Sequence, residues 1–510
     1  SEMCIRDSAA GGQVVADREE SGYDIRMDED GLVLNLGDEL IDDTPADPDS
    51  AAPVPRPVSE DDLAELARVE RELLARWPET KIDPSLERIE MLMDFLGHPE
   101  RAYKVIHVAG TNGKTSTVRM IESLLRSFGA RVGRTTSPHL QSITERVGID
   151  GEPIHPADFV RIYDEITPFI EMVDGKSDHP MSYFEVTVAI ALAAFADAPV
   201  EIAVVEVGMG GTWDATNVVE SDVDVIMPVG LDHTDYLGDT LAEIAGEKAG
   251  IVRRPEAVTV VANQEPDAMR VILERTVEVG TAVARLDEEF GVEEAGVAVG
   301  GQTLILRGLS GTYDNIFLPL SGPHQARNAA VALAAVEAFF GAGAEKPLDA
   351  DTVREGFAAA VSPGRLERVR STPTTFVDAT HNPHGAHALA AAIERDFNFA
   401  RLIGVLGILD DKDAVGVFTA LEPVLSEVVI TQNSSPRATD AYELAETARD
   451  IFGEERVHVE EHLPSAYTLA VELAEEALEA VGAQSGSGVL ITGSVVTAGE
   501  ARAMFGKDPE

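Results

Sequence analysis

The chain has 510 residues, enough for two or three domains, and its 44% hydrophobic and 25% charged residues are typical of a globular protein. Its formal net charge of -50 repels nucleic acid and anionic membranes, so we expect neither as a partner. The only cysteine is Cys4, which excludes disulfides and cysteine-ligated metals. No apolar run is long enough to span a bilayer and no basic-then-apolar leader opens the chain, so we expect a cytoplasmic protein.

Residues 1–58 are rich in Asp, Gly, Ser and Pro, a composition that buries too little apolar surface to offset the entropy of ordering. We therefore predict a disordered, acidic N-terminal extension, in which only the apolar patch at residues 32–36 is a candidate strand. Ordered structure is expected from Ser59, a plausible N-cap for a helix of about sixteen residues. A second helix is predicted over residues 84–95.

The next segment reads as a strand, a glycine loop and the start of a helix. Residues 103–109 are apolar, Gly110-Thr111-Asn112-Gly113 turns the chain, and residues 115–128 carry apolar side chains at helical spacing. The backbone N–H groups of such a loop, the helix N-terminus and Lys114 cradle a polyphosphate, and the hydroxyl of Thr115 or Ser116 can reach Mg²⁺. The P-loop pattern is partial, because Val108 stands at its first glycine. We expect the ligand of this loop to be a nucleoside triphosphate.

Strands then alternate with helices along the rest of the chain, which predicts parallel sheets covered on both faces, with ligands at the carboxyl ends of the strands. Residues 285–320 look like a β-rich excursion, and the pattern restarts after Ser362-Pro363-Gly364-Arg365. The predicted fold is α/β: a P-loop-containing parallel-sheet ATPase domain over residues 59–362, followed by a smaller Rossmann-like domain over residues 363–510.

Three polar groups follow predicted strands of the first domain. Ser137, Glu206 and the pair Asp232-His233 can converge on one edge of the sheet and hold Mg²⁺ against nucleotide phosphates. Each alone reads better as a capping or packing residue, and histidine is unusual for Mg²⁺, which prefers oxygen.

Lys248 follows the capping box Thr240-Leu241-Ala242-Glu243. It is either a surface lysine or, beside metal ions that would repel an ammonium group, a lysine carbamylated by CO₂.

Asp378 and His381 follow a predicted strand of the second domain. The aspartate can orient a ribose or an amine, and the histidine can bind a phosphate or carboxylate; an Asx turn is the alternative. Gln325, Arg327 and Asn328 open a predicted helix and can read an adenine edge.

Nine ordered motifs resemble one enzyme family, the folylpolyglutamate synthase / dihydrofolate synthase family of the Mur ligase superfamily. They run in family order across roughly residues 80–500 and are Gly110 to Ser116, Thr136 to Leu140, Tyr183 to Thr187, Glu206 to Gly211, Asp214 to Asn217, Leu231 to His233, Glu247 to Ile251, Pro363 to Arg365 and Asp378 to Pro383.

The resemblance implies an ATP-dependent ligase that adds L-glutamate to dihydropteroate, to tetrahydrofolate or to both, through an acyl phosphate. ATP would be a co-substrate, with two Mg²⁺ ions and a carbamylated Lys248. Lys114, Lys248, Asp378 and His381 would be catalytic. ATP contacts would be residues 110–116, Asn328, Arg365 and Asp378; metal ligands Thr115 or Ser116, Ser137, Glu206 and His233; and acceptor or glutamate contacts Phe184, Glu185, Trp213, Asp214 and Ser494.

One departure from the family pattern affects the acceptor site. Thr212-Trp213 stands where the family more often has Arg-Leu, so the chain loses a cation and gains an indole able to stack on a flat ring. Two other functions stay open: a Mur-type ligase with another acceptor, for which residues 1–58 are too polar to form the extra folded domain, and a non-catalytic ATP-binding regulator, which the retained lysines and carboxylates disfavour. We expect a monomer.

Overall fold

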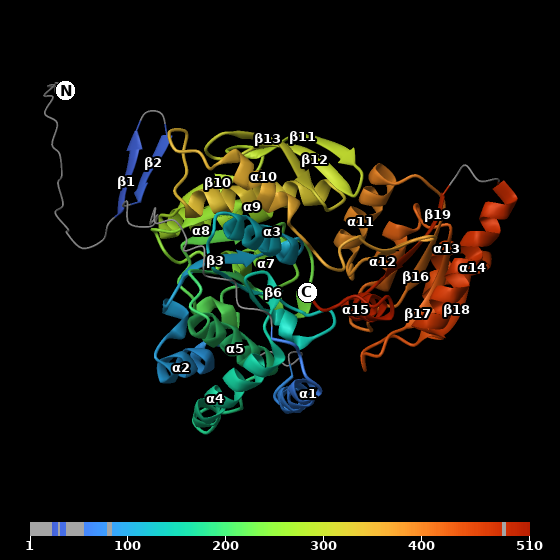
Figure 1. Cartoon of the computed structure of the whole chain (residues 1–510), viewed down its shortest axis with the longest axis horizontal. Helices are drawn as coiled ribbons and strands as arrows, with labels where there is room; N and C mark the ends of the chain where they lie inside the picture. Colours follow the sequence, from blue (N-terminus) through green and yellow to red (C-terminus); the bar gives the residue numbers. More distant parts are fainter. Residues whose placement is uncertain (1–22, 29–30, 37–55, 79–83, 482–485) are drawn as a thin grey trace, which may run out of the picture. The chain divides into compact units, whose positions relative to one another are not determined.

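We analysed a computed structural model, which describes residues 23–28, 31–36, 56–78, 84–481 and 486–510 (Figure 1). Residues 1–53 form one unit and residues 54–510 another. In the first unit, β1 (Tyr23–Asp28) pairs antiparallel with β2 (Gly31–Leu36), so their backbone groups bond to each other. The predicted disorder is therefore wrong for these two strands, of which β2 covers the apolar patch; the rest of residues 1–55 lies outside the described residues.

Two helices open the second unit close to where they were predicted. Helix α1 (Glu60–Leu74) starts at Ser59, whose side chain accepts from the N–H of Asp62 while the Asp62 carboxylate accepts from the N–H of Ser59. Helix α2 (Glu87–Leu96) ends at Gly97, which has the positive φ of +77° that ends helices.

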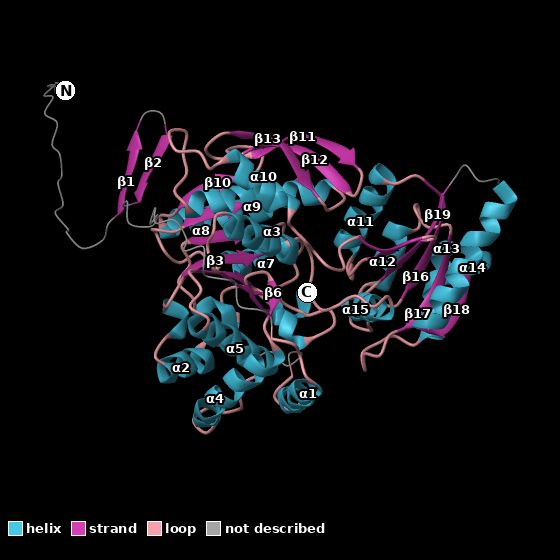
Figure 2. Ribbon diagram, viewed as in Figure 1, coloured by secondary structure: helices cyan, strands magenta, loops and turns pink. Residues whose placement is uncertain are grey.

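The first large sheet has eight strands in the order β10-β9-β8-β3-β7-β4-β5-β6. Figure 2 shows helices on either side of it. Its pairs are parallel from β10 to β4, and β5 and β6 continue antiparallel. The strands are β3 (Lys104–Ala109), β4 (Val132–Thr135), β5 (Val147–Ile149), β6 (Glu152–Pro153), β7 (Ile202–Glu206), β8 (Val223–Ile226), β9 (Val258–Val261) and β10 (Ala282–Arg285).

Helices cover both faces of this sheet because its strands are apolar on both sides. Along β3, Val105 packs in one core while Ile106 and Val108 pack in another. The helices are α3 (Lys114–Ser127), α4 (Pro156–Asp174), α5 (Tyr183–Asp197), α6 (Thr234–Leu237), α7 (Leu241–Ala249), α8 (Pro266–Val279), α9 (Pro323–Phe339) and α10 (Ala350–Ala358). The predicted β-rich excursion is a three-stranded antiparallel sheet of β11 (Gly291–Ala298), β12 (Gly301–Arg307) and β13 (Thr312–Leu318).

The second large sheet has six strands in the order β14-β15-β19-β16-β17-β18, all parallel except β14. The strands are β14 (Glu367–Ser371), β15 (Thr374–Val377), β16 (Phe399–Leu406), β17 (Glu427–Gln432), β18 (Val457–His462) and β19 (Gly486–Thr492). The helices are α11 (Pro383–Asp396), α12 (Ala414–Leu421), α13 (Ala441–Phe452), α14 (Leu463–Val481) and α15 (Val495–Met504). This α/β architecture confirms the predicted fold class.

The buried cores divide between the two sheets. Every fully buried member of the three cores around the first sheet lies at or before Ala360, and every one around the second lies at or after Leu366. The boundary at residues 362/363 stays a prediction, which this division favours. Among the described residues, no helix is both long and apolar enough to cross a membrane.

Candidate active site

The phosphate loop lies between β3 and α3, and its glycines are needed for close approach. A side chain at Gly110 (φ +145°) would put its Cβ 2.5 Å from the Cβ of Met227, and one at Gly113 (φ +86°) would come 2.9 Å from the amide oxygen of Asn328. Only glycine accommodates both the space and the backbone angle. The loop therefore lies tightly against the end of β8 and against α9, with the N-terminus of α3 open behind it.

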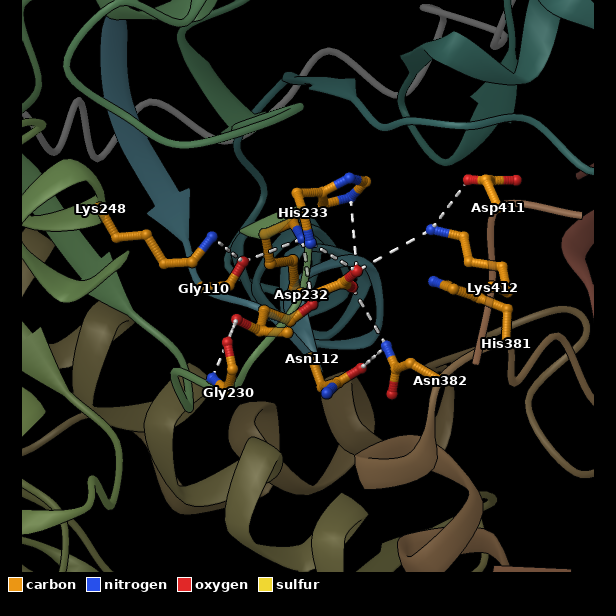
Figure 3. Close-up of polar contacts among 12 residues, drawn as sticks. Gly110, Asn112, Gly230, Asp232, His233, Lys248, His381, Asn382, Asp411 and Lys412 are labelled. Carbon is orange, nitrogen blue, oxygen red and sulfur yellow. Dashed lines mark hydrogen bonds and ion pairs between the residues drawn. The ribbon is translucent and has the colours of Figure 1, made fainter. Parts of the chain in front are cut away.

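Two lysines share one carbonyl of this loop. The amine of Lys114 donates to the carbonyl of Gly110 at 3.0 Å and to that of Thr111 at 3.3 Å. Lys248, buried on α7, donates to the same Gly110 carbonyl at 3.0 Å (Figure 3). Burial, reinforced by the charge of Lys114, lowers the pKa of Lys248 to about 7. The loop thus carries concentrated positive charge, as polyphosphate binding requires.

Glu206 ends β7 beside the start of α3. Its Oε1 accepts from the hydroxyl of Thr115 at 3.0 Å, while its buried Oε2 has no hydrogen-bond partner among the described residues. Burial raises the pKa of Glu206, opposed by Lys114 and the Thr115 hydroxyl; the backbone of Ser137 adds a further hydrogen bond. A buried, half-satisfied carboxylate is costly unless a cation completes it. These groups fit the oxygen ligands that Mg²⁺ prefers.

Ser116 does not join this group. Its hydroxyl is buried 2.9 Å from that of Ser362 and accepts from the amide of Gln325 at 3.2 Å. Of the two hydroxyls that the sequence offered as metal ligands, the structure therefore brings only that of Thr115 to Glu206, because successive helical residues point in different directions.

Asp232 and His233 follow β8, and His233 has an unusual φ of +51°. Burial lowers the pKa of His233 to about 4; Asp232 opposes this, and lysines 412, 114 and 248 add to it. Its imidazole is therefore neutral near pH 7 and able to act as a ligand. No cluster of three or more His, Cys, Asp or Glu side chains able to hold a metal occurs in the described part of the chain.

Asp232 also contacts residues that follow strands of the second sheet (Figure 3). Its carboxylate lies 3.8 Å from the amine of Lys412 and accepts from the amide of Asn382 at 3.3 Å. The same amide donates to Asn112 of the phosphate loop at 3.2 Å, and the amide of Asn112 lies 2.8 Å from the ring of His384. These contacts connect the carboxyl end of the first sheet to the carboxyl end of the second sheet.

Sequence reasoning missed Lys412. A signal was present in the sequence, because lysine is scarce: the chain has eight. In the structure, three of them lower the pKa of His233. The eight are Lys81, Lys104, Lys114, Lys176, Lys248, Lys346, Lys412 and Lys507.

The predicted ATP contacts occupy the turn that joins the two sheets and the helix facing it. Asn328 donates to Gln325 at 3.1 Å on α9, whereas Arg327 is turned away to pair with Asp287. Asp378 accepts from the backbone N–H of Leu366 at 2.7 Å and from that of Thr380 at 2.8 Å. Its carboxylate therefore joins β15 to the turn that carries Arg365.

Arg365 and His381 flank Asp378. Arg365 donates to the carbonyl of Gly364 at 3.2 Å. The ring Nδ1 of His381 lies 3.0 Å from the carbonyl of Ala379, and burial lowers its pKa. A neutral His381 with its ring oriented by the backbone can accept or donate a proton through its other nitrogen.

The residues predicted near the acceptor divide into two pairs. Phe184 and Trp213 are half-buried aromatics beside the Gly208 to Gly211 loop: a Cβ on Gly208 would lie 2.3 Å from the ring of Phe184, and one on Gly210 would lie 3.2 Å from the indole of Trp213. They present flat apolar surface.

The two carboxylates of that group are hydrogen-bonded within the protein itself, and their role at the acceptor site stays a prediction. Glu185 caps α5 and forms a buried ion pair with Arg88, with Nε to Oε1 at 2.9 Å. Asp214 is 2% exposed and accepts from the backbone N–H groups of Met209 at 2.8 Å and Thr216 at 3.0 Å. Asp214 therefore holds the loop after β7, and Glu185 holds the start of α5 against Arg88.

Ser494 is likewise hydrogen-bonded to other residues of the protein. It is fully buried, caps α15 through the N–H of Thr497 at 2.9 Å and accepts from Asn433 at 3.1 Å. Its hydroxyl is therefore buried and partnered within the second domain, and its role as a glutamate contact stays a prediction.

Comparisons with known proteins place this geometry in a class. The Mur ligase middle domain matches residues 108–336, and the Mur ligase glutamate ligase domain matches residues 364–495. The chain is thus built from the two domains of a Mur-type ligase.

Relatives narrow the class further. A dihydrofolate synthase/folylpolyglutamate synthase of Mycobacterium tuberculosis is 54% identical over 479 residues, covering 91% of this chain and 98% of the relative. A solved structure of Mycobacterium tuberculosis folylpolyglutamate synthase complexed with ADP and AMPPCP superposes with a TM-score of 0.84 at 53% identity, covering 88% of this chain and all of that one. Escherichia coli FolC in complex with DHPP and ADP gives 0.73 at 30% identity, over 86% and 97%. The chain belongs to the folylpolyglutamate synthase / dihydrofolate synthase family of Mur ligases.

Proposed function

We propose that this chain uses ATP to join L-glutamate to the carboxylate of dihydropteroate, of a reduced folate, or of both. ATP-dependent ligation of glutamate to a folate-type acceptor follows from its family. The observation that carries the proposal is the crowding of Lys114 and Lys248 on the Gly110 carbonyl, beside the half-satisfied carboxylate of Glu206. A lysine and a buried carboxylate beside a glycine loop at a helix N-terminus suit a nucleoside triphosphate and its Mg²⁺.

The reaction has two balanced steps. A carboxylate oxygen of the acceptor attacks the γ-phosphorus, and the bond from that phosphorus to the β,γ-bridging oxygen breaks. ADP is released, and the acceptor becomes an acyl phosphate. The glutamate amine then attacks the acyl carbon, loses a proton, and expels inorganic phosphate. Phosphoryl transfer asks the protein mainly for positioning and charge neutralisation. Lys114 supplies charge at the loop, and Arg365 supplies it from the turn between the sheets.

Mg²⁺ fits the donors around Glu206. Thr115, Ser137, Glu206 and the neutral ring of His233 would hold it, with the nucleotide phosphates completing its shell. When bound, the ion neutralises phosphate charge. The ion would also give a partner to the buried Glu206 oxygen that has none among the described residues.

Lys248 is suited to carbamylation. The reaction of its neutral amine with CO₂ forms an N–C bond and releases one proton, giving a carbamate with one negative charge. A pKa of about 7 leaves a large neutral fraction at physiological pH, whereas an ordinary lysine has almost none. The carbamate would replace a cation that competes with Mg²⁺ by an anion that attracts it.

The acceptor site is proposed at Phe184 and Trp213, whose half-buried rings border the loop that follows Glu206. The indole of Trp213, which stands where the family more often has leucine, offers stacking to a flat heterocycle. The backbone N–H of Thr212 donates to the carbonyl of Glu247 at 3.0 Å, which holds the backbone next to Trp213 against α7. We expect a monomer to be sufficient, because every group named here comes from one chain.

The test is phosphate release from MgATP and L-glutamate, with dihydropteroate and tetrahydrofolate compared as acceptors and products identified by mass. A product one glutamyl unit heavier with both acceptors means a bifunctional enzyme, and with one it assigns the specificity. The proposal would be overturned by ATP hydrolysis at the same rate with and without glutamate. It would also be overturned if no turnover depended on the acceptor at low or high salt.

A further inference from the structure

Arg502 is a buried cation far along the chain from every group in the proposed chemistry. It lies in the last turn of α15, and its side chain is 0% exposed. Arginine is almost never fully buried unless it is paired. Its partners therefore show what it holds in place.

The guanidinium contacts three separate segments. Its Nε donates to Glu367 at 2.8 Å at the start of β14, and its Nη1 donates to the carbonyl of Asp508 at 3.1 Å. The same Nη1 also donates to the amide oxygen of Gln141, in the loop that follows β4. One planar group with five donors in a fixed geometry can tie three segments together, which an ammonium group cannot reproduce.

The Glu367 contact leads to the nucleotide arginine. The Glu367 oxygen that binds Arg502 also accepts from the backbone N–H of Gly364 at 2.8 Å. Gly364 has a φ of +63° and directly precedes Arg365, the cation proposed to reach ATP from the turn between the sheets. Arg502 thus acts on the backbone that aims Arg365.

The Gln141 contact leads to Ser137. The backbone N–H groups of Leu140 and Gln141 bond to the carboxylate of Glu145 at 2.8 and 2.9 Å, which makes a stiff loop out of the segment after Ser137. Helix α15 lies directly against this loop: a Cβ on Gly499 would come within 1.9 Å of the Leu140 carbonyl oxygen.

We propose that Arg502 is a positioning residue that sets Arg365 and the Ser137 loop relative to the phosphate loop, so that nucleotide affinity depends on how α15 is seated. This inference rests on the proposed function, because it assumes that Arg365 and Ser137 serve ATP. It places control of nucleotide binding in α15, a helix that contacts the loop after Ser137 and Glu367 but supplies none of the proposed nucleotide contacts.

The experiment compares Arg502→Met and Arg502→Lys with a matched control, Arg456→Met. Arg456 also binds a carboxylate, that of Glu422 at 2.6 Å, together with backbone carbonyls, but all its partners lie within the second sheet's domain. Loss of Arg502 should raise the MgADP dissociation constant and the KM for ATP about tenfold, within the range of energetic coupling between sites. The KM for the folate acceptor should not change, the lysine variant should lie between, and the control should match wild type in both nucleotide constants.

MgADP binding is measured by calorimetry without acceptor, which separates this proposal from the proposed function. If wild type binds MgADP but ligates no folate, the function fails while the Arg502 comparison still stands. If Arg502→Met does not fold, Gln141→Met and Gly499→Ala decide, and each should weaken MgADP binding in a folded protein. A lowered melting temperature with unchanged MgADP affinity, in any of these variants that folds, would make Arg502 purely structural and overturn the inference.

Discussion

The carboxyl ends of the two parallel sheets look alike in sequence and differ in chemistry. At the first sheet, Glu206 keeps a buried oxygen without a partner among the residues described, and two lysines share the Gly110 carbonyl. At the second sheet, Ser494, Asn433 and Thr497 satisfy one another at 2.9 to 3.1 Å. A polar residue after a strand is therefore not evidence of a site by itself. What marks the site is charge and hydrogen-bonding capacity that the protein leaves for a ligand.

Loss of the phosphate-loop lysine should give the largest effect at the first sheet. In Lys114→Met, kcat should fall by about 100- to 1000-fold, the usual consequence of removing one preorganised charge-stabilising group. Steady-state phosphate release measures it, with Lys346→Met, an exposed lysine, as the control for loss of charge. A fall of less than tenfold would mean that Lys114 does not contact the transferred phosphoryl group.

Lys248 tests the chemistry at the first sheet through the pH dependence of its activity. Lys248→Ala should lose about 10- to 100-fold of activity, as groups that orient metal ligands do, and acetate should restore part of it. With CO₂ removed and then returned at fixed dissolved concentration, reactivation of wild type should speed up from about pH 6 to about pH 8, because the neutral amine grows as pH passes its pKa of about 7.

The matched variant for this prediction is Lys248→Arg, which stays charged at every pH and should show no reactivation. Full activity in Lys248→Ala, or a reactivation rate independent of pH, would end the carbamate hypothesis.

Glu185 tests whether a residue of the family motif near the acceptor is structural. In Glu185→Leu, the buried Arg88 loses its carboxylate partner, which should lower the free energy of unfolding by about 3 to 5 kcal/mol, with the KM for the acceptor unchanged. Urea denaturation measures the loss, and the double variant with Arg88→Met should recover most of it. A raised acceptor KM in a fully stable variant would return Glu185 to the binding site.

Ser494 should give the smallest effect, at the satisfied end of the second sheet. Ser494→Ala removes the N-cap of α15 and should cost about 1 kcal/mol of stability while the KM for glutamate stays within twofold of wild type, as expected of a cap alone. Thermal unfolding and glutamate titration in parallel provide the check. A glutamate KM raised tenfold without loss of stability would favour the sequence prediction over the structure.

The residues that the sequence placed well are those whose partners are near in the chain. The helix start at Ser59 follows from its reciprocal bonds with Asp62, three residues on, and the phosphate loop follows from its own glycines. Other residues have distant partners that the sequence did not indicate: Glu185 pairs with Arg88, 97 residues away, and Ser116 bonds to Ser362, 246 residues away. No local pattern reports such a partner.

By itself, then, the sequence determined the order of strands and helices, the glycine loop and the family, because these depend on periodicity, backbone angles and short motifs. Only the tertiary structure decided which polar atoms remain for a ligand. Glu206 ends strand β7 and Asp214 lies in the loop after it, yet one has an oxygen without a partner among the described residues and the other is satisfied by backbone N–H groups. Whether a buried carboxylate awaits a cation depends on every donor that folding brings within about 3 Å of it, and those donors come from the whole chain.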